Sequence, residues 1–429
     1  MLHVDKADSF LTEKVIISAS GLNPFQCYQF QLLLHSDQGT LRAFCVIKSN
    51  ESGKIDLSKD EPIRGTYHGV DPMGLFLTLL RTDDVRYGAY VRNPDANPYF
   101  FTLRLLSNTD QLLDKLHLKK RWVHPSVTEI QLSQDGLTGT IFKPPGLGPF
   151  PCIIDVPLVN GKLFKAHASL LASEGFLTYC FPMFDEPGLP KRMQDVDIEY
   201  LSRHIKLVQT LPYCSSKIGL YGNSFAGTIA LQLATRHPEL STVVSVNGPE
   251  AFFRDTGYMR EDGRPMNCET IDNSLAFHIN GVLRQTPVFA DVFSRLKPET
   301  SIPWDKMSKH ISFRLVGSLD DWLMDAITNG YRIRDHLQRT GHNVEYDLVP
   351  GGHTIIIPYQ PHQWFAYNKF VGTVLGFGGE NYLHVKSQVR VWEDHLKFFR
   401  KHLGTPRNLP DYVRDTEIVM SERVKKSKI

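Results

Sequence analysis

The chain has 429 residues, of which 41% are hydrophobic and 22% are charged, so a disordered, collagenous or coiled-coil protein is excluded. Forty-eight Lys and Arg residues face 46 Asp and Glu residues, a formal net charge of +2. This balance argues against a nucleic-acid partner and against binding to a membrane surface, both of which favour a strongly basic protein. The length predicts two or three domains of about 150 residues each.

The cysteines and the amino terminus predict a soluble, intracellular protein. None of the six cysteines forms a CxxC pair, and Cys45, Cys152 and Cys180 stand in apolar, strand-like segments, which is typical of reduced, buried thiols. The first eight residues lack the basic-then-apolar order of a signal peptide. Because no apolar run approaches about 18 residues, we expect no membrane span.

The first part of the chain, residues 1–122, is predicted to form an antiparallel β-sandwich. Strand-like runs at 15–18, 28–34, 41–47, 65–68 and 99–105 are separated by turn residues at intervals of about ten. The basic cluster Lys119, Lys120 and Arg121 is predicted to form a solvated face between domains. A contact of this cluster with a phosphate-bearing ligand is the alternative.

The second part, residues 123–408, alternates strands with helices. A hairpin at 127–132 and 139–142 precedes strands at 152–156, 176–181, 218–221, 242–246, 311–316 and 344–349, and helices are expected at 164–173, 195–210, 225–236, 326–339 and 385–402. This order predicts a parallel sheet covered on both faces. Residues 250–305 interrupt the pattern and are interpreted as an insertion near a site entrance. Residues 409–429 are predicted to be a charged, flexible tail.

The strongest local signal is the segment 219–227, in which Ser224 stands between a strand and a helix. In a nucleophile elbow the serine lies on a strained turn, and only small residues fit two positions before and after it. Gly222 and Ala226 satisfy that requirement. A Ser in a glycine-rich turn without chemistry is the alternative reading.

A serine nucleophile needs a base and an acid that orients the base, in the chain order Ser, Asp or Glu, His. Asp320 follows the strand at 311–316 and His353 follows the strand at 344–349. Both loops lie at carboxyl ends of strands, where such sheets bind ligands, so we predict Asp320 as the acid and His353 as the base. Asp320 and its neighbour Asp321 could instead cap the next helix, and His353 could be an ordinary loop histidine.

No motif predicts a metal or a phosphate-binding loop. The chain has no His-Glu-x-x-His and no cluster of Cys and His, and no Lys-Ser/Thr follows the glycines at 376–379. We therefore expect neither a metal site nor a resident cofactor.

Short motifs along residues 10–405 together resemble one family, the type I acyl-CoA thioesterases and bile acid-CoA:amino acid N-acyltransferases. These motifs lie at 20–24, 69–76, 139–151, 168–172, 175–176, 246–248, 316–320, 352–361 and 378–380. The resemblance implies an immunoglobulin-like β-sandwich followed by an α/β-hydrolase domain that acts on acyl-CoA thioesters. It assigns the nucleophile to Ser224, the acid to Asp320 and the base to His353.

The oxyanion of the reaction is expected to lie on two backbone N–H groups, one from Phe225 and one from the loop at 157–162, with Leu158 or Val159 as the donor. This loop replaces a run of glycines in the family. Ala226 stands where the family usually has Gly, and Ile356 and Ile357 replace a usual Glu-Pro.

The predicted function is hydrolysis of fatty acyl-CoA to free fatty acid and coenzyme A, which is part of the substrate and not a cofactor. Family members with Ser at the nucleophile position tend to be thioesterases, whereas the bile-acid-conjugating members have Cys. The alternatives are an acyl-CoA:amino acid N-acyltransferase with glycine or taurine as acceptor, a carboxylesterase, and a catalytically silent acyl-CoA-binding protein.

The chain ends in Ser427, Lys428 and Ile429, which resembles the peroxisomal Ser-Lys-Leu signal. The sequence thus predicts a peroxisomal protein whose partner is the import receptor. A solvated basic tail on a cytoplasmic protein is the alternative.

Overall fold

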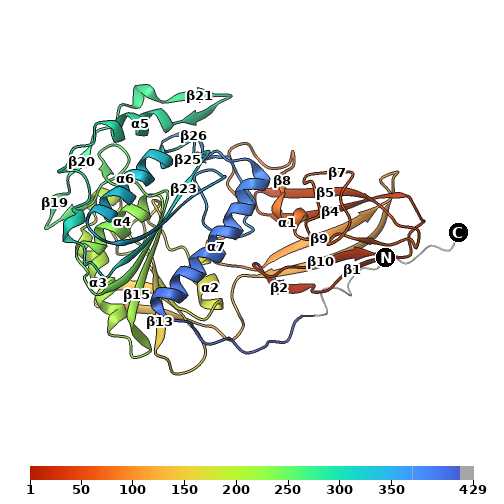
Figure 1. The fold of residues 1–429 in the computed structure, drawn as a ribbon, viewed down its shortest axis with the longest axis horizontal. Helices are drawn as coiled ribbons and strands as arrows, with labels where there is room; N and C mark the ends of the chain where they lie inside the picture. The colour runs from red at the N-terminus through yellow and green to blue at the C-terminus, as the bar shows by residue number, and fades with distance from the viewer. Residues whose placement is uncertain (370, 416–429) are drawn as a thin grey trace.

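A computed structural model describes residues 1–369 and 371–415. The chain folds into a β-sheet region and a larger α/β region, and the long helix α7 (Asn381–Leu403) runs between them (Figure 1). The end of the chain that carries Ser427, Lys428 and Ile429 lies outside the described residues. No helix among the described residues is long and apolar enough to cross a membrane.

Two sheets form the amino-terminal region, which confirms the predicted sandwich. The smaller sheet has the order β1 (Leu2–Val4), β3 (Ile17–Ala19), β6 (Ile55–Asp56). The larger one has the order β2 (Asp8–Phe10), β10 (Leu112–Arg121), β9 (Tyr99–Leu106), β4 (Cys27–Ser36), β5 (Gly39–Lys48), β7 (Arg64–Gly65), with β8 (Leu80–Arg81) also paired to β5. Along β5 the buried Leu41 and Ala43 flank the exposed Arg42, which is the alternation of a strand with one face in a core. The short helix α1 (Gly74–Leu77) packs on α7.

The basic cluster at 119–121 is not a solvated face, so that prediction was wrong. It is the end of β10, where Lys120 is 1% exposed and its Nζ donates to the carbonyls of Phe10 and Glu13. Burial lowers the pKa of Lys120 to about 7. Arg121 forms a two-bond ion pair with Asp8, at 2.6 and 2.7 Å. These cations are satisfied by protein groups and do not form a phosphate site.

Two residues of the predicted flexible tail, Tyr412 and Arg414, contact the amino-terminal region. Tyr412 packs on Phe10 with ring centroids 5.0 Å apart, and Arg414 donates to both carboxylate oxygens of Glu13 at 2.8 and 2.9 Å. Tyr412 and Arg414 therefore lie against the amino-terminal region, and the flexibility of the tail stays a prediction.

The second region has an eight-stranded sheet, as predicted for an α/β-hydrolase fold. Its order is β11 (Thr128–Gln134), β12 (Leu137–Lys143), β14 (Leu177–Cys180), β13 (Phe150–Asp155), β15 (Cys214–Asn223), β16 (Leu240–Val246), β23 (Ser312–Ser318), β24 (Asn343–Val349). The pairs β11–β12 and β12–β14 are antiparallel and the other pairs are parallel. The helices are α2 (Ala166–Ser173), α3 (Ile198–Gln209), α4 (Phe225–Ala234), α6 (Ala326–Arg339) and α7.

Consecutive residues of the central strands belong to different cores. Ile153 lies in one cluster with residues of α2 and α7, whereas Cys152 and Ile154 lie in another with residues of α3, α4 and α6. Because side chains alternate along a strand, a sheet covered on both faces needs apolar residues at every position. This explains the continuous apolar runs in the sequence.

The first of these clusters extends across both regions of the protein. It joins Leu75 and Phe76 of α1 to Val385 and Trp392 of α7 and continues beneath the large sheet. The two regions therefore share one apolar interior. All six cysteines lie among the described residues, and none of them forms a disulfide.

Residues 250–305, 365–369 and 371–376 form small additional elements beside the large sheet. These are β17 (Phe252–Phe253), β18 (Arg260–Glu261), β19 (Arg264–Pro265), β20 (Cys268–Glu269), β21 (Phe277–Ile279), β22 (Val282–Arg284), α5 (Thr286–Ser294), β25 (Phe365–Asn368) and β26 (Thr373–Gly376), with the short 3₁₀ turns η2 (Asn273–Leu275) and η3 (Trp304–Lys306). A third 3₁₀ turn, η1 (Met193–Asp195), precedes α3. Residues 250–305 contact the turn of Ser224, because Phe252 packs on Phe225 with ring centroids 5.1 Å apart.

Candidate active site

Ser224 lies in the turn between β15 and α4, with backbone angles φ 55° and ψ −128°. A non-glycine residue with positive φ is strained, and such strain is typical of a functional turn. The Ser224 N–H donates to the carbonyl of Val246 over 2.7 Å, which ties the turn to the end of the neighbouring strand β16. The hydroxyl thus lies at the carboxyl edge of the sheet and at the amino end of a helix.

Close backbone packing explains the small residues around Ser224. A Cβ on Gly222 would lie 2.2 Å from the carbonyl oxygen of Ala226, and one on Gly227 would lie 2.4 Å from the Oγ of Ser245 and 3.0 Å from the Cα of Gly248. Both approaches are shorter than real Cβ contacts, so glycine is needed at these two positions. Ala226 itself is fully buried.

His353 lies in the loop after β24, and its Nε2 is 2.7 Å from the Oγ of Ser224. Its Nδ1 is 2.7 Å from the Oδ2 of Asp321. The side chains of His353 and Asp321 are only 3% and 1% exposed. Because Asp321 accepts at Nδ1, Nε2 is free to accept the hydroxyl proton of Ser224, which is the geometry of a serine nucleophile with its base and orienting acid.

The structure therefore corrects the choice of acid from Asp320 to Asp321. Asp320 is exposed, and its two oxygens accept the Nε1–H of Trp322 over 2.7 Å and the N–H of Gly379 over 3.0 Å. The structure brings Ser224 and His353 together as predicted, but it does not bring Asp320 to them.

Asp321 accepts from backbone N–H groups as well as from His353, but it does not cap the next helix. Its Oδ1 accepts the N–H groups of Leu323 and Met324, each over 2.9 Å, as a turn-capping residue does. Its Oδ2 remains for His353. Helix α6 is capped by a different residue, Asp325, whose side chain accepts the N–H of Thr328.

A second histidine, His384, accepts a hydrogen bond from the loop of His353. The Gly352 N–H donates to the Nδ1 of His384 over 3.0 Å, and the His353 N–H donates to the carbonyl of Phe377 over 2.7 Å. Burial holds the pKa of His384 well below its usual range, so its ring stays neutral and Nδ1 can accept.

The candidate oxyanion donors come from two segments that each follow a strand of the large sheet. Phe225 is the first residue of α4, so its N–H has no carbonyl partner within the helix. Leu158 and Val159 lie in the loop after β13, and their N–H groups donate to no acceptor in residues 1–369 or 371–415. The assignment of Phe225, Leu158 and Val159 stays a prediction.

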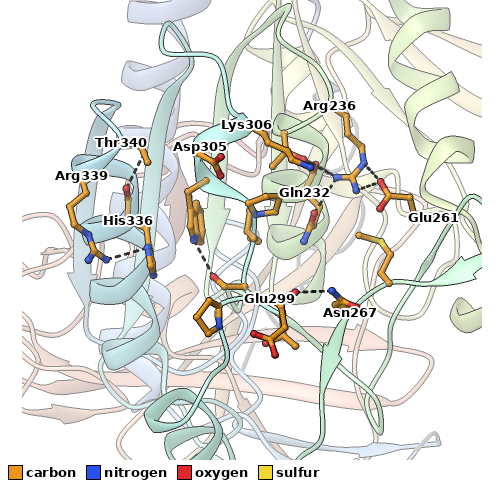
Figure 2. Close-up of a pocket in the computed structure, with 18 residues that line it drawn as sticks. Gln232, Arg236, Glu261, Asn267, Glu299, Asp305, Lys306, His336, Arg339 and Thr340 are labelled. Carbon is orange, nitrogen blue, oxygen red and sulfur yellow. Dashed lines mark hydrogen bonds and ion pairs between the residues drawn. The ribbon is translucent and has the colours of Figure 1, made fainter.

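A cavity of about 770 Å³ lies away from these residues, between the carboxyl ends of α4 and α6 (Figure 2). Gln232, Arg236, Trp304 and His336 are among its lining residues, whereas Ser224 and its two partners are not. Arg236 is paired there with Glu261. The side chains that line the cavity include both acids and bases, and the cavity does not belong to the site of Ser224.

Within the described part of the chain, no three His, Cys, Asp or Glu side chains gather as a metal-binding group.

The sequence did not predict three roles in this site. Asp321 is the partner of His353, and His384 and Asn247 hold the loop of His353 by hydrogen bonds. Asn247 has φ 50°, and the Asn-Gly pair after a strand signals a turn but not its hydrogen bonds.

Two family models match the chain. Residues 12–134 match the family model "Acyl-CoA thioester hydrolase/BAAT N-terminal region", and residues 196–405 match "BAAT / Acyl-CoA thioester hydrolase C terminal".

Relatives with both kinds of activity resemble the chain over most of its length. An acyl-coenzyme A amino acid N-acyltransferase 1 of Mus musculus is 30% identical over 413 residues, covering 92% of this chain and 96% of the relative. A peroxisomal succinyl-coenzyme A thioesterase of Mus musculus is 29% identical over 406 residues, covering 92% and 94%. A solved structure, the Pyrococcus horikoshii acylaminoacyl peptidase, is 12% identical with a TM-score of 0.45, covering 95% of this chain and 72% of that one.

Both family models match in the expected order, and the relatives extend over nearly the whole chain. The chain belongs to the family of acyl-CoA thioester hydrolases and bile acid-CoA:amino acid N-acyltransferases.

Proposed function

We propose that this protein is a thioesterase that hydrolyses fatty acyl-CoA to a free fatty acid and coenzyme A. The observation that carries the proposal is the continuous chain from Ser224 Oγ to His353 to Asp321, with both contacts at 2.7 Å, on a strained elbow. Membership of the family supplies the substrate class, acyl-CoA thioesters. The cycle needs no cofactor, because coenzyme A enters as part of the substrate.

In the first step, the Nε2 of His353 takes the hydroxyl proton of Ser224 while Oγ forms a bond to the thioester carbonyl carbon. The carbonyl oxygen becomes an anion and is bound by the Phe225 N–H and by an N–H of the loop at 157–162. The C–S bond then breaks, and the His353 imidazolium gives its proton to the sulfur, so coenzyme A leaves as a thiol. The carboxylate of Asp321 stabilises the imidazolium between these transfers.

In the second step, His353 takes a proton from a water molecule, whose oxygen attacks the acyl-Ser224 ester. The C–Oγ bond breaks, Oγ takes the proton back from His353, and the fatty acid leaves. Ser224→Ala or His353→Ala should therefore reduce thiol release by about 10⁴-fold or more while the protein stays folded. Full thiol release in Ser224→Ala would overturn the proposal.

Amino acid conjugation is the second candidate function, because two of the relatives at 30% identity are named N-acyltransferases. Ser224 favours water over an amine as the acceptor, since an oxygen ester is a poorer acyl donor to amines than a thioester is. Mass spectrometry of the products, with and without glycine or taurine, separates the two. Amide as the main product would identify a transferase.

Two further readings have simple tests. A carboxylesterase would release alcohol from simple esters faster than it releases thiol from acyl-CoA. A silent binding protein would retain acyl-CoA without releasing thiol. A panel of acyl-CoAs of different chain length, assayed for free thiol beside simple esters assayed for free alcohol, decides between these readings and defines the preferred substrate.

We further propose a peroxisomal location, reached through an import receptor that binds Ser427, Lys428 and Ile429. The resemblance to the Ser-Lys-Leu signal and the peroxisomal name of one relative support it. A fluorescent reporter that carries the last twelve or so residues should collect in peroxisomes. A reporter that stays diffuse would favour the cytoplasm.

A further inference from the structure

Asn247 is the first residue after β16, directly after the carbonyl of Val246 that accepts the Ser224 N–H. Its side chain is buried, and its φ of 50° is a left-handed conformation that Asn adopts more readily than most residues. The backbone N–H of Asn247 donates to the carbonyl of Val316 over 2.9 Å. This residue therefore stands between the strand ends that carry the nucleophile and the acid.

The side-chain amide of Asn247 links the loop that carries Asp321 to the loop that carries His353. Its Oδ1 accepts the Ser318 N–H over 2.9 Å, and its Nδ2 donates to the Oγ of Ser318 over 2.8 Å and to the backbone carbonyl of His353 over 2.9 Å. The Ser318 hydroxyl in turn donates to the carbonyl of Gly352 over 2.8 Å. Ser318 ends β23, three residues before Asp321. Both amide protons of Asn247 are thus used to join the acid loop to the base loop.

We infer that Asn247 is a positioning residue that fixes His353 relative to Ser224 and Asp321, an inference that rests on the proposed serine mechanism. It acts through the backbone of His353, which is held by Asn247 at its carbonyl and by Phe377 at its N–H. Without the amide, the buried His353 carbonyl would lose its donor, and the loop would move to find another. A displacement of about 1 Å in a catalytic group costs about 10²-fold in rate.

Two substitutions separate the amide donor from other roles of the residue. Asn247→Gly removes the side chain without straining the left-handed backbone. Asn247→Asp keeps the shape, the preference for positive φ and the acceptor for the Ser318 N–H, but an ionised carboxylate cannot donate to the His353 carbonyl. If Asn247 only fills space, Asn247→Asp should be as active as the wild type.

Asn329 offers a matched control. It is also a buried amide, and it holds the next residues of the same segment: its Nδ2 donates to the Gly248 carbonyl over 2.7 Å and its Oδ1 accepts the Glu250 N–H over 3.0 Å. Among the described residues, its side chain forms no hydrogen bond with the loop of Asp321 or with that of His353. Asn329→Asp should therefore destabilise the protein as Asn247→Asp does, but it should not lower the rate of Ser224 labelling or kcat.

The experiment measures the rate of Ser224 labelling by a fluorophosphonate, together with kcat and KM for acyl-CoA and the melting temperature. We expect Asn247→Gly and Asn247→Asp to lower the labelling rate and kcat by about 10- to 100-fold with little change in KM, and Asn329→Asp to leave the rates within about twofold. Wild-type labelling by Asn247→Asp would overturn the inference. Absence of Ser224-dependent labelling in the wild type would instead overturn the proposed mechanism, and the inference with it.

If the Asn247 variants do not fold, Ser318→Ala tests the same connection from its other side. This change removes the hydroxyl that bridges the Asn247 amide and the Gly352 carbonyl. A labelling rate lowered by about tenfold, at a melting temperature near that of the wild type, supports the inference. An unchanged labelling rate contradicts it.

Discussion

The indole N–H of Trp322 donates to the Oδ1 of Asp320 over 2.7 Å, and with the Gly379 N–H at Oδ2 it occupies both oxygens of this carboxylate. Asp320 therefore links the loop after β23 to the segment that precedes α7. Its neighbour Asp321 is left to accept from His353. Two adjacent acids in one loop thus have different partners and different tasks.

Asp321→Asn should lower kcat by about 10⁴-fold, because an amide cannot stabilise the His353 imidazolium and can hold the ring in the wrong tautomer. Asp320→Asn should lower kcat by no more than about tenfold, because Asp320 orients loops and touches no reacting group. Steady-state thiol release from acyl-CoA measures both effects. The reverse order would return the role of the acid to Asp320.

Gly222→Ala should damage the elbow, because its Cβ would lie 2.2 Å from the backbone carbonyl of Ala226, which cannot rotate away as a side chain does. Overpacking of this kind costs about 1–3 kcal/mol. Thermal unfolding and fluorophosphonate labelling of Ser224 should both show the loss.

The control for Gly222→Ala is Ala226→Gly, which makes the opposite change in size at the facing position. It should retain labelling and cost about 1 kcal/mol, the ordinary price of glycine in a helix. Equal stability and labelling of Gly222→Ala and the wild type would show that the turn can relax.

Ser224→Cys should change which acceptor takes the acyl group. The intermediate becomes a thioester, which amines attack far more readily than they attack an oxygen ester, while water gains less. The variant should hydrolyse acyl-CoA more slowly and form N-acyl glycine or taurine when the amine is abundant. Mass spectrometry at fixed acyl-CoA and rising amine measures the ratio of amide to acid. An unchanged ratio would mean that the shape of the site excludes the amine.

The sequence predicted the fold class and two of the three residues that the structure links, Ser224 and His353. Apolar runs without alternation predicted the buried parallel strands, and small residues around Ser224 predicted the elbow, because both follow from local packing. The choice between Asp320 and Asp321 could not be made this way. It depends on Trp322 and on Gly379, a residue 59 positions further along the chain, and the contact with Gly379 forms only in the folded protein.

The strand β10 was missed for a related reason. Its carboxyl end reads as a charged run, yet Lys120 is buried because the carbonyls of Phe10 and Glu13 accept its ammonium protons. A buried charge needs distant partners of this kind, and no local pattern identifies them. Asn247 was missed because its amide joins residues 71 and 106 positions away.

The stability of the protein should fall as the pH is lowered below about 6.5. Burial lowers the pKa of His204 to about 3, and it also lowers the pKa of His384 and His395. Above pH 6.5 these rings are neutral in the folded and in the unfolded protein, so they do not change the free energy of unfolding with pH. Below it the unfolded chain binds protons that the folded protein cannot, so each such histidine removes about 1.4 kcal/mol per pH unit, for His204 down to about pH 3.

Denaturant unfolding between pH 7.5 and 5 measures this slope. His204→Phe should reduce it by about 1.4 kcal/mol per pH unit, because the ring that replaces the imidazole can still stack on Phe181 and does not titrate. A His204→Phe slope equal to that of the wild type would contradict the attribution.

The apolar cluster that joins α1 to α7 and continues beneath the large sheet has a consequence for cooperativity. Domains that share an interior cannot lose it independently, because melting of one uncovers apolar surface on the other. Heating should therefore give a single calorimetric transition for the whole chain, although no strand of the amino-terminal sheets pairs with a strand of the eight-stranded sheet in the described residues. A protein that begins at residue 123 would expose the face of α7 that packs on α1, and it should bind a dye for apolar surfaces and aggregate.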